Sequence, residues 1–281
     1  MTSRPMLAPL REVITTYGLD ARKALGQHFL LDQNITDKIV RISGAGSADA
    51  VLEIGPGPGG LTRSLLRTGA HVTVIERDER CIGILEDLRE HYPGQLTIQM
   101  EDALACDEFR MLNGGPARIV SNLPYNISTE LLVKWLHAGA DLWTSMTLMF
   151  QREVADRILA QPGSKIYGRL SVISQAASTP QKGFDLPARA FTPPPKVDSS
   201  VVHFEPPSIN PKSIRTLETI TQAAFSQRRK MVRSSLKSVL GPSLDDTLEH
   251  CEILPTMRAE EISVPQYLRP ATLLINRPRE P

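Results

Sequence analysis

The sequence predicts an α/β protein with a mainly parallel sheet, followed by a small helical domain. Two observations lead to this prediction. Between residues 50 and 150, short apolar runs alternate with longer amphipathic stretches, which is the pattern of β-α-β-α units joined by right-handed crossovers. From residue 212 onward the sequence turns polar with a helical pattern, so we place a domain boundary at about residue 208.

Five short runs, each rich in apolar residues, are expected to form the parallel strands. A sheet covered by helices on both faces has strands of this kind, because no face of the strand meets water. The runs are AVLEI (50–54), HVTVIE (71–76), LTIQM (96–100), RIVSNL (118–123) and MTLMF (146–150).

Helices are expected between these strands. LTRSLLRTG (61–69) ends on a glycine that can cap a helix, DERCIGILEDLREH (78–91) opens with acidic residues, and STELLVKWLHAG (128–139) starts with a Ser/Thr cap. After a Pro-rich stretch, the alternating run SVVHF (200–204) is expected to join the sheet as a late antiparallel strand. The predicted domains are therefore residues 1–207 and 208–281.

Composition and charge exclude several classes of protein. The 281 residues carry a formal net charge of +1, and no run approaches the roughly 18 apolar residues of a membrane-spanning helix. The three cysteines are far apart and have no metal-binding spacing, so we expect neither a disulfide framework nor a metal site. The first 23 residues lack the apolar core and cleavage site of a secretory signal, so we expect a cytoplasmic protein that does not bind membranes.

A glycine-rich turn follows the first predicted strand, in EIGPGPGG (53–60). Gly55 and Gly57 let the backbone approach a ligand closely before the chain enters a helix. This pattern fits a dinucleotide, S-adenosylmethionine or a simple tight turn. Pro56 and Pro58 stiffen the loop and argue against the dinucleotide.

Acidic residues follow the next two strands. Glu76 lies 21 residues after Gly55 at the end of the second strand, where a carboxylate can accept both hydroxyls of an adenosine ribose. Asp102 follows the third strand and could accept a hydrogen bond from an adenine amino group. Glu76 could also merely cap a loop. Because the carboxyl ends of parallel strands share one edge of a sheet, these residues favour a nucleoside site there.

The fourth strand ends in the tetrapeptide Asn122-Leu123-Pro124-Tyr125. An exocyclic amine is a poor nucleophile, because its lone pair is delocalised into the ring, and acceptors that favour a tetrahedral nitrogen promote its reaction. The Asn122 side-chain oxygen and the Leu123 carbonyl can act as such acceptors, Pro124 fixes the chain, and Tyr125 offers a ring for a flipped-out base. The tetrapeptide resembles that of methyltransferases acting on adenine amino groups, although an Asn-Pro turn alone would also explain it.

Further motifs extend this resemblance over about residues 10–270. Together they resemble the small-subunit ribosomal RNA adenine N6,N6-dimethyltransferases. The motifs are LGQHFLLD (25–32), NLPYNIS (122–128), FQREVADR (150–157), YGRLS (167–171), FTPPPKVDSS (191–200) and FSQRRKMVR (225–233).

The resemblance implies a Rossmann-like class I methyltransferase sheet, S-adenosyl-L-methionine as the consumed methyl donor, and no metal. It implies N6-dimethylation of two adjacent adenines in the 3′-terminal hairpin of 16S-type rRNA. The expected partner is small-subunit rRNA within an assembling 30S-type particle, and the expected oligomeric state is a monomer. The expected biological role is small-subunit biogenesis.

Site residues follow from the resemblance position by position. The donor site is assigned to His28, Leu30, Gly55, Gly57, Glu76, Asp102 and Asn122. The chemical and base-binding site is assigned to Asn122, Leu123, Pro124, Tyr125 and Phe191, with Phe191 facing Tyr125 across the target base. His28 departs from the family pattern, in which many members have Asn, but both side chains can donate a hydrogen bond.

Basic residues are concentrated after the predicted boundary. Residues 212–237 hold seven basic residues and one acidic residue, Glu218. Such a run is often only a solvated face, but beside a base-modifying site a phosphate-binding surface is favoured. The expected RNA contacts are Arg228, Arg229, Lys230 and Arg233.

Two other functions fit part of these observations. One is an antibiotic-resistance methyltransferase acting on a single adenine of large-subunit rRNA; the YGRLS and FTPPPKVDSS motifs favour the small-subunit family instead. The other is a ribosome-assembly or transcription factor that keeps the fold without catalysis. The presence of Asn122, Tyr125 and Glu76 argues against that function.

Overall fold

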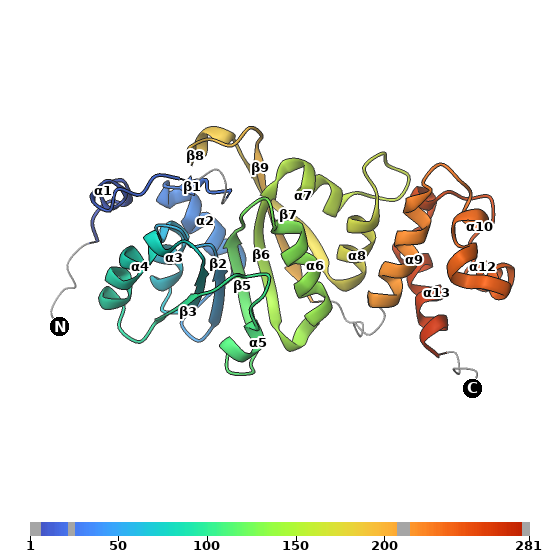
Figure 1. The fold of residues 1–281 in the computed structure, drawn as a ribbon, viewed down its shortest axis with the longest axis horizontal. Coiled ribbons are helices and arrows are strands. Elements are labelled where there is room, and N and C mark those ends of the chain that lie inside the picture. The colour runs from blue at the N-terminus through green and yellow to red at the C-terminus, as the bar shows by residue number, and fades with distance from the viewer. Residues whose placement is uncertain (1–6, 22–25, 207–213, 277–281) are drawn as a thin grey trace. The chain divides into compact units, whose positions relative to one another are not determined.

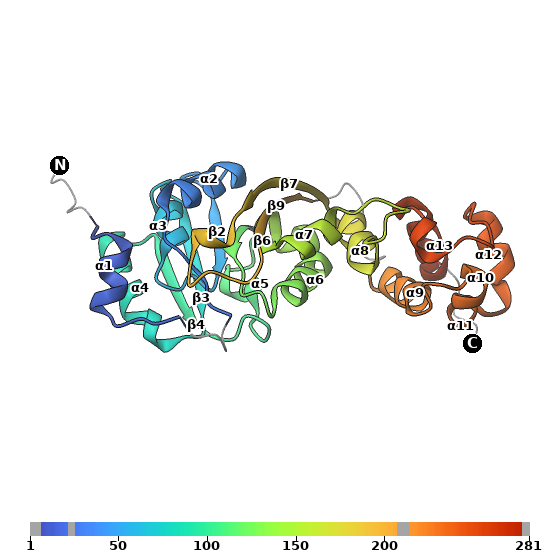
Figure 2. The same ribbon diagram turned by 90° about the horizontal axis from the view of Figure 1, so that it is seen from above.

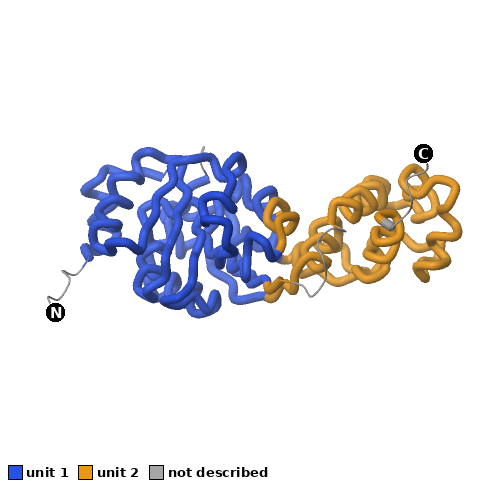
Figure 3. Tube along the Cα trace, turned by 90° about the horizontal axis from the view of Figure 1, so that it is seen from below, with its two compact units in different colours: residues 1–132, 140–155, 182–204 blue, residues 133–139, 156–181, 205–281 orange. Residues whose placement is uncertain are grey.

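The computed structural model describes residues 7–21, 26–206 and 214–276. The chain divides into two compact units, coloured separately in Figure 3. The first comprises Met1–Leu132, Ala140–Ala155 and Lys182–Phe204; the second comprises Val133–Gly139, Asp156–Gln181 and Glu205–Pro281. The predicted boundary at residue 208 and the basic residue Lys212 lie outside the described residues, so the functional division at that point stays a prediction.

A seven-stranded sheet forms the centre of the first unit (Figure 1). Its strand order is β4-β3-β2-β5-β6-β9-β7. The neighbouring pairs from β4 to β6 are parallel, and β9 runs antiparallel to β6. The strands are β2 (Ala50–Ile54), β3 (His71–Glu76), β4 (Leu96–Met100), β5 (Ala117–Asn122), β6 (Trp143–Gln151), β7 (Thr179–Leu186) and β9 (Ser199–Glu205). The predicted fold class, with one late antiparallel strand, is confirmed.

Helices alternate with these strands along the chain, as Figure 2 also shows. They are α1 (Leu10–Thr16), α2 (Gln33–Ser43), α3 (Gly60–Leu66), α4 (Glu79–His91), α5 (Glu108–Met111), α6 (Ser128–Ala138) and α7 (Arg152–Leu159). A separate two-stranded sheet pairs β1 (Phe29–Leu30) with β8 (Phe191–Thr192) in antiparallel fashion.

The core explains why the strands are apolar throughout. Val51 and Leu52 are neighbours on β2 and point to opposite faces of the sheet, yet both are completely buried. Val51 packs in one hydrophobic cluster with Leu65 of α3 and Leu85 of α4. A strand that is covered on both faces is apolar along its whole length instead of alternating apolar and polar residues. This continuous apolar pattern made these strands predictable.

Some elements differ from the prediction. The helix expected over 61–69 ends at Leu66, and Gly69 adopts a left-handed conformation three residues later. Strand β7 was not predicted, because its sequence TPQKGFDL is polar and most of it is exposed at the edge of the sheet. Edge strands do not require the apolar pattern that marks central ones.

The second unit is helical, with α8 (Arg169–Ala177), α9 (Ile214–Ser226), α10 (Val232–Ser235), α11 (Lys237–Leu240), α12 (Leu244–His250) and α13 (Val264–Asn276). Helix α9 packs against α8 and α13. Two buried tyrosines stabilise the second unit. The Tyr167 hydroxyl donates to the Ile262 carbonyl (3.0 Å), and the Tyr267 hydroxyl donates to the Ala259 carbonyl (2.8 Å). In the described part of the chain, no helix is long and apolar enough to cross a membrane.

Candidate active site

A cavity lies at the carboxyl ends of β2, β3, β4 and β5 in the first unit. Its lining includes ten residues that the sequence assigned to a site: His28, Leu30, Gly55, Gly57, Glu76, Asp102, Asn122, Leu123, Pro124 and Tyr125. Phe191 is not among the lining residues. Its side chain is only 2% exposed, and its backbone pairs with Leu30 across the small sheet. The fold therefore brings together all but one of the residues predicted for donor and base.

The glycine-rich turn forms one wall of this cavity. Gly55 and Gly57 have φ angles of 64° and 55°, in the left-handed region that disfavours other residues. A Cβ atom would lie 3.3 Å from the Pro124 ring at Gly55 and 3.2 Å from the Phe29 ring at Gly57. Both conformation and space thus require glycine, and the turn brings the backbone against the tetrapeptide and the segment before α2.

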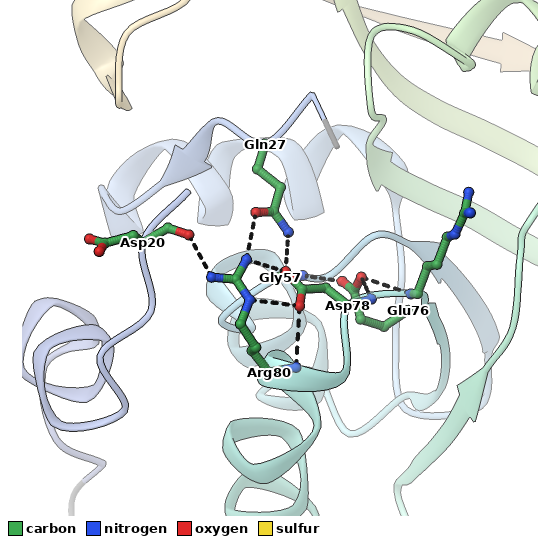
Figure 4. Close-up of polar contacts among 7 residues, drawn as sticks. Asp20, Gln27, Gly57, Glu76, Asp78 and Arg80 are labelled. Carbon is green, nitrogen blue, oxygen red and sulfur yellow. Dashed lines mark hydrogen bonds and ion pairs between the residues drawn. The ribbon is translucent and has the colours of Figure 1, made fainter. Parts of the chain in front are cut away.

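Glu76 lies at the end of β3 and is buried. Its Oε1 accepts from the backbone N–H groups of Arg77 and Asp78, both at 2.8 Å, and its Oε2 accepts from the Gly57 N–H at 3.0 Å (Figure 4). Burial raises the pKa of this carboxyl, while the three backbone hydrogen bonds act in the opposite direction. The bonds fix the orientation of the carboxylate, and Oε2 keeps capacity to accept from a ligand hydroxyl.

Glu53 is a lining residue that the sequence analysis missed. It lies on β2, is 2% exposed, and its Oε2 accepts from the Thr62 hydroxyl at 2.7 Å. Burial raises the pKa of Glu53 to about 8, and the nearby Glu76 carboxylate adds to this effect. The available signal was a single acidic residue inside the otherwise apolar strand AVLEI.

Asn122 has a defined amide orientation. Its Nδ2 donates to the carbonyl oxygen of His28 at 3.2 Å, which leaves Oδ1 as the atom that can accept from a ligand. The His28 ring is fixed as well, because a carbonyl can only accept and Nδ1 lies 2.8 Å from the Pro193 oxygen. Nδ1 therefore carries a proton and donates to this carbonyl.

Tyr125 lies beside these two residues. Its ring stacks on the His28 ring with centroids 5.6 Å apart and an interplanar angle of 28°. Its hydroxyl lies 2.5 Å from the Ser199 hydroxyl of β9. The Tyr125 carbonyl accepts from the Ser128 hydroxyl, which begins α6. The tetrapeptide is thus held between β5, β9 and α6, with an aromatic face at the cavity.

Asp102 is the most exposed of the predicted acidic residues. Its Oδ1 accepts from the Leu104 N–H at 3.0 Å, and its Oδ2 accepts from the Arg77 guanidinium at 3.1 Å. Both side chains of this ion pair are substantially exposed. Both residues line the cavity after the ends of β3 and β4, where the sequence predicted an adenine contact.

The four basic residues predicted to contact RNA lie in the second unit and are not equivalent. The Arg228 guanidinium donates to the Ser164 carbonyl at 3.3 Å and lies 3.6 Å from the Glu260 carboxylate. Arg233 pairs with Asp245 at 2.9 Å. Arg229 and Lys230 are exposed. Two of the four charges are therefore partly neutralised within the chain.

No group of three or more His, Cys, Asp and Glu side chains that could hold a metal ion occurs among residues 7–21, 26–206 and 214–276. Of the carboxylates at the cavity, Glu76 accepts from backbone N–H groups, Glu53 accepts from Thr62, and Asp102 pairs with Arg77.

A family model and sequence relatives identify one family, and solved structures share the fold. Residues 18–276 match the family model described as ribosomal RNA adenine dimethylase. A ribosomal RNA small subunit methyltransferase A from Mesorhizobium japonicum is 53% identical over 272 residues, covering 94% of this chain and 96% of the relative. Among solved structures, a dimethyladenosine transferase from Plasmodium falciparum matches with a TM-score of 0.76, 28% identity, and coverage of 89% of this chain and 98% of that one. The 23S rRNA methyltransferase ErmE matches in fold, with a TM-score of 0.67, 24% identity, and coverage of 88% and 100%.

Proposed function

This chain belongs to the ribosomal RNA adenine dimethylase family, and from that premise we propose that it dimethylates N6 of two adjacent adenines in small-subunit rRNA. The proposed target is the 3′-terminal hairpin of a 16S-type rRNA, and the methyl donor is S-adenosyl-L-methionine. The enzyme class agrees with the names of the relatives, while the nucleotides follow from the resemblance of the motifs.

The orientation of the Asn122 amide carries this proposal. Because Nδ2 is engaged by the His28 carbonyl, Oδ1 is the free acceptor at the end of β5. A target amino group that donates to Oδ1 and to the Leu123 carbonyl is favoured in the tetrahedral form, in which its lone pair can attack. The reverse orientation would present donors to an amine that needs acceptors.

The residues at the cavity fit the donor. The turn at Gly55 and Gly57 leaves room for a ligand against the backbone, and Glu76 is oriented at the end of β3 as a ribose acceptor. We assign Asp102, His28 and Leu30 to the same ligand because they line the same cavity. When bound, S-adenosylmethionine supplies an electrophilic methyl group on a sulfonium; this chain contributes orientation, acceptors and exclusion of water.

The target base is assigned to the face of Tyr125 at the cavity. The Tyr125 ring is held by the Ser199 hydroxyl and by stacking on His28, so it is preorganised as a platform. Phe191 is assigned to the opposite side of the base by resemblance, and this assignment requires that its buried side chain become accessible when RNA binds.

The substrate is proposed to be rRNA within an assembling 30S-type particle. The enzyme is proposed to act on it as a monomer in the cytoplasm. The second unit supplies Arg229 and Lys230 for phosphates, with Arg228 and Arg233 beside them. Cations of this kind read the backbone and position the enzyme without specifying sequence.

A single-turnover methyl-transfer assay on small-subunit rRNA tests the mechanism. Asn122→Ala should slow transfer by about 10²-fold or more, which is the usual cost of one well-placed acceptor or donor at the reacting group. Affinity for S-adenosylhomocysteine, measured by calorimetry, should fall much less. Asn34→Ala is the matched control, because Asn34 is exposed on α2 and does not line the cavity.

Mapping of methylated adenines in cells with and without the protein tests the substrate. Loss of N6-dimethyladenine from the 3′ end of small-subunit rRNA is the expected result. Loss of methylated adenine from large-subunit rRNA instead would show that large-subunit rRNA is the substrate. Wild-type transfer by Asn122→Ala would refute the assigned chemistry.

A further inference from the structure

Asp78 lies outside the cavity lining but directly behind the ribose acceptor. It caps α4 by accepting from the Arg80 N–H, and its side chain is 3% exposed. Its own N–H donates to Oε1 of Glu76. Asp78 therefore supplies one of the three backbone hydrogen bonds that orient the Glu76 carboxylate.

Arg80 holds the Asp78 carboxylate with both arms of its guanidinium. Nε donates to Oδ1 at 2.9 Å and Nη2 donates to Oδ2 at 2.6 Å (Figure 4). This bidentate geometry is the strongest arrangement of an arginine with a carboxylate, because two parallel hydrogen bonds fix both the distance and the plane. A lysine could supply the positive charge but could not donate two coplanar hydrogen bonds to the carboxylate.

The same guanidinium reaches the chain that precedes β1. Nη1 donates to the Asp20 carbonyl at 2.9 Å, and Nη2 lies 3.5 Å from Oε1 of Gln27. Gln27 in turn donates from Nε2 to Oδ2 of Asp78 at 2.8 Å. Gln27 lines the cavity and precedes His28, whose carbonyl orients Asn122. One arginine thus connects the wall that carries Glu76 with the wall that carries His28.

We propose that Arg80 is a positioning residue for the methyl donor, acting through Asp78 and Gln27 to hold the two walls of the cavity at the spacing that the donor requires. This inference rests on the proposed placement of S-adenosylmethionine in that cavity. Arg80 itself is not among the residues that line it.

Charge gives Arg80 a second effect on the same site. Its side-chain hydrogen bonds are the largest cause that lowers the pKa of Asp78, to about 2, so Asp78 is ionised. The Asp78 charge raises the pKa of Glu76. Without Arg80 this repulsion loses its counter-charge, so we expect the pKa of Glu76 to rise further. The charged and titratable groups around Glu76 are Glu53 of β2, Arg77 and Asp78 of the loop, and Arg80 and Cys81 of α4.

Calorimetric titration with S-adenosylhomocysteine from pH 6 to 8 tests the role. Arg80→Met should weaken binding by about tenfold, as loss of an outer-shell partner does at metal sites, and the loss should grow as pH falls. The kcat at saturating donor and rRNA should change much less than the KM for the donor. Arg89→Met is the matched control, because Arg89 lies on the same helix in an exposed pair with Glu86.

Two further variants separate charge from geometry. The double variant Asp78→Asn/Arg80→Met keeps a side-chain acceptor at the N-cap of α4 but removes the negative charge of residue 78. The pH dependence that Arg80→Met adds to binding should therefore disappear, while part of its loss of affinity remains. Arg80→Lys should keep the wild-type pH dependence but bind more weakly, because it cannot span Asp78, Asp20 and Gln27. It also serves if Arg80→Met does not fold.

Wild-type affinity and pH profile in both Arg80→Met and Arg80→Lys would overturn the role of Arg80 alone. Absence of binding by the wild-type protein would instead refute the donor site, and the inference about Arg80 would fall with it. A loss of folding stability without a change in KM or pH profile would make Arg80 a purely structural residue and would also overturn the proposal.

Discussion

Glu53→Gln is the substitution whose effect on stability follows most directly from the structure. Glu53 is buried on β2, with Thr62 as a hydrogen-bond donor and Glu76 nearby. Burial raises its pKa to about 8, from an ordinary value of 4.5. Glutamine has nearly the same shape, keeps an oxygen for the Thr62 hydroxyl and cannot ionise.

The sign of the effect follows from proton binding. Between the unfolded and folded pKa values, the native protein holds a proton on Glu53 that the unfolded chain releases, so the free energy of unfolding falls as pH rises through this window. The slope approaches about 1.4 kcal/mol per pH unit, or about 5 kcal/mol at most across the whole interval. The contribution is complete below the unfolded pKa and lost above the folded one.

Urea unfolding at about pH 5.5 and about pH 8 measures this window. Between about pH 5.5 and about pH 8, the free energy of unfolding should fall by about 3 kcal/mol more in the wild-type protein than in Glu53→Gln. Glu76, whose pKa is also raised by burial, contributes a loss of the same sign to both proteins, so the difference reports Glu53 together with its coupling to Glu76. Glu90→Gln, at an exposed position of α4, is the control and should follow the wild type. Parallel losses in wild type and Glu53→Gln would refute a neutral, buried Glu53.

The remaining predictions concern ligands. Glu76→Ala should weaken S-adenosylhomocysteine binding by about 1–3 kcal/mol in calorimetry, because it leaves ligand hydroxyls and backbone N–H groups unpaired. Unchanged affinity would show that the donor does not bind at the end of β3. Tyr125→Ala should raise the KM for rRNA in steady-state transfer assays without changing donor affinity, and an unchanged KM would show that the base does not stack there. Arg229→Ala/Lys230→Ala should flatten the slope of log affinity against log salt by about 1.4–1.8, and an unchanged slope would make these residues an ordinary solvated face.

Much of the sheet was predictable because burial on two faces leaves a strong signal. Strands β2, β3 and β4 were predicted with the observed bounds, since each is a short run rich in apolar residues between helical segments. The edge strand β7 and the two-residue strands β1 and β8 carry no such signal. Their positions depend on contacts with distant residues, such as the pairing of Leu30 with Phe191, which sequence patterns do not encode.

The site was predictable to the extent that sheet geometry determines it. Glu76 and Asn122 end β3 and β5, Asp102 follows β4, and parallel pairing brings these strand ends to one cavity. Arg80 was not predictable in the same way, because an arginine in the first turn of a helix is normally solvent-exposed. Its role depends on a segment some 60 residues earlier in the chain.

Charge counting along the sequence was also incomplete for a physical reason. It treated Arg228, Arg229, Lys230 and Arg233 as equivalent, although Arg233 pairs with Asp245 and Arg228 lies near Glu260. A cation with an intramolecular partner must give up that partner to bind a phosphate, so its net contribution to RNA affinity is smaller. Local sequence does not show this, because Asp245 and Glu260 lie outside the basic run.

Three carboxylates lie close together at and just after the ends of β2 and β3, and each is stabilised in a different way. Glu53 is neutralised by burial, Glu76 is held by three backbone N–H groups, and Asp78 is paired with Arg80. If all three were ionised without partners, their mutual repulsion would destabilise the empty site. A cationic donor reduces that repulsion, so donor binding should favour ionisation of Glu53 and release a proton.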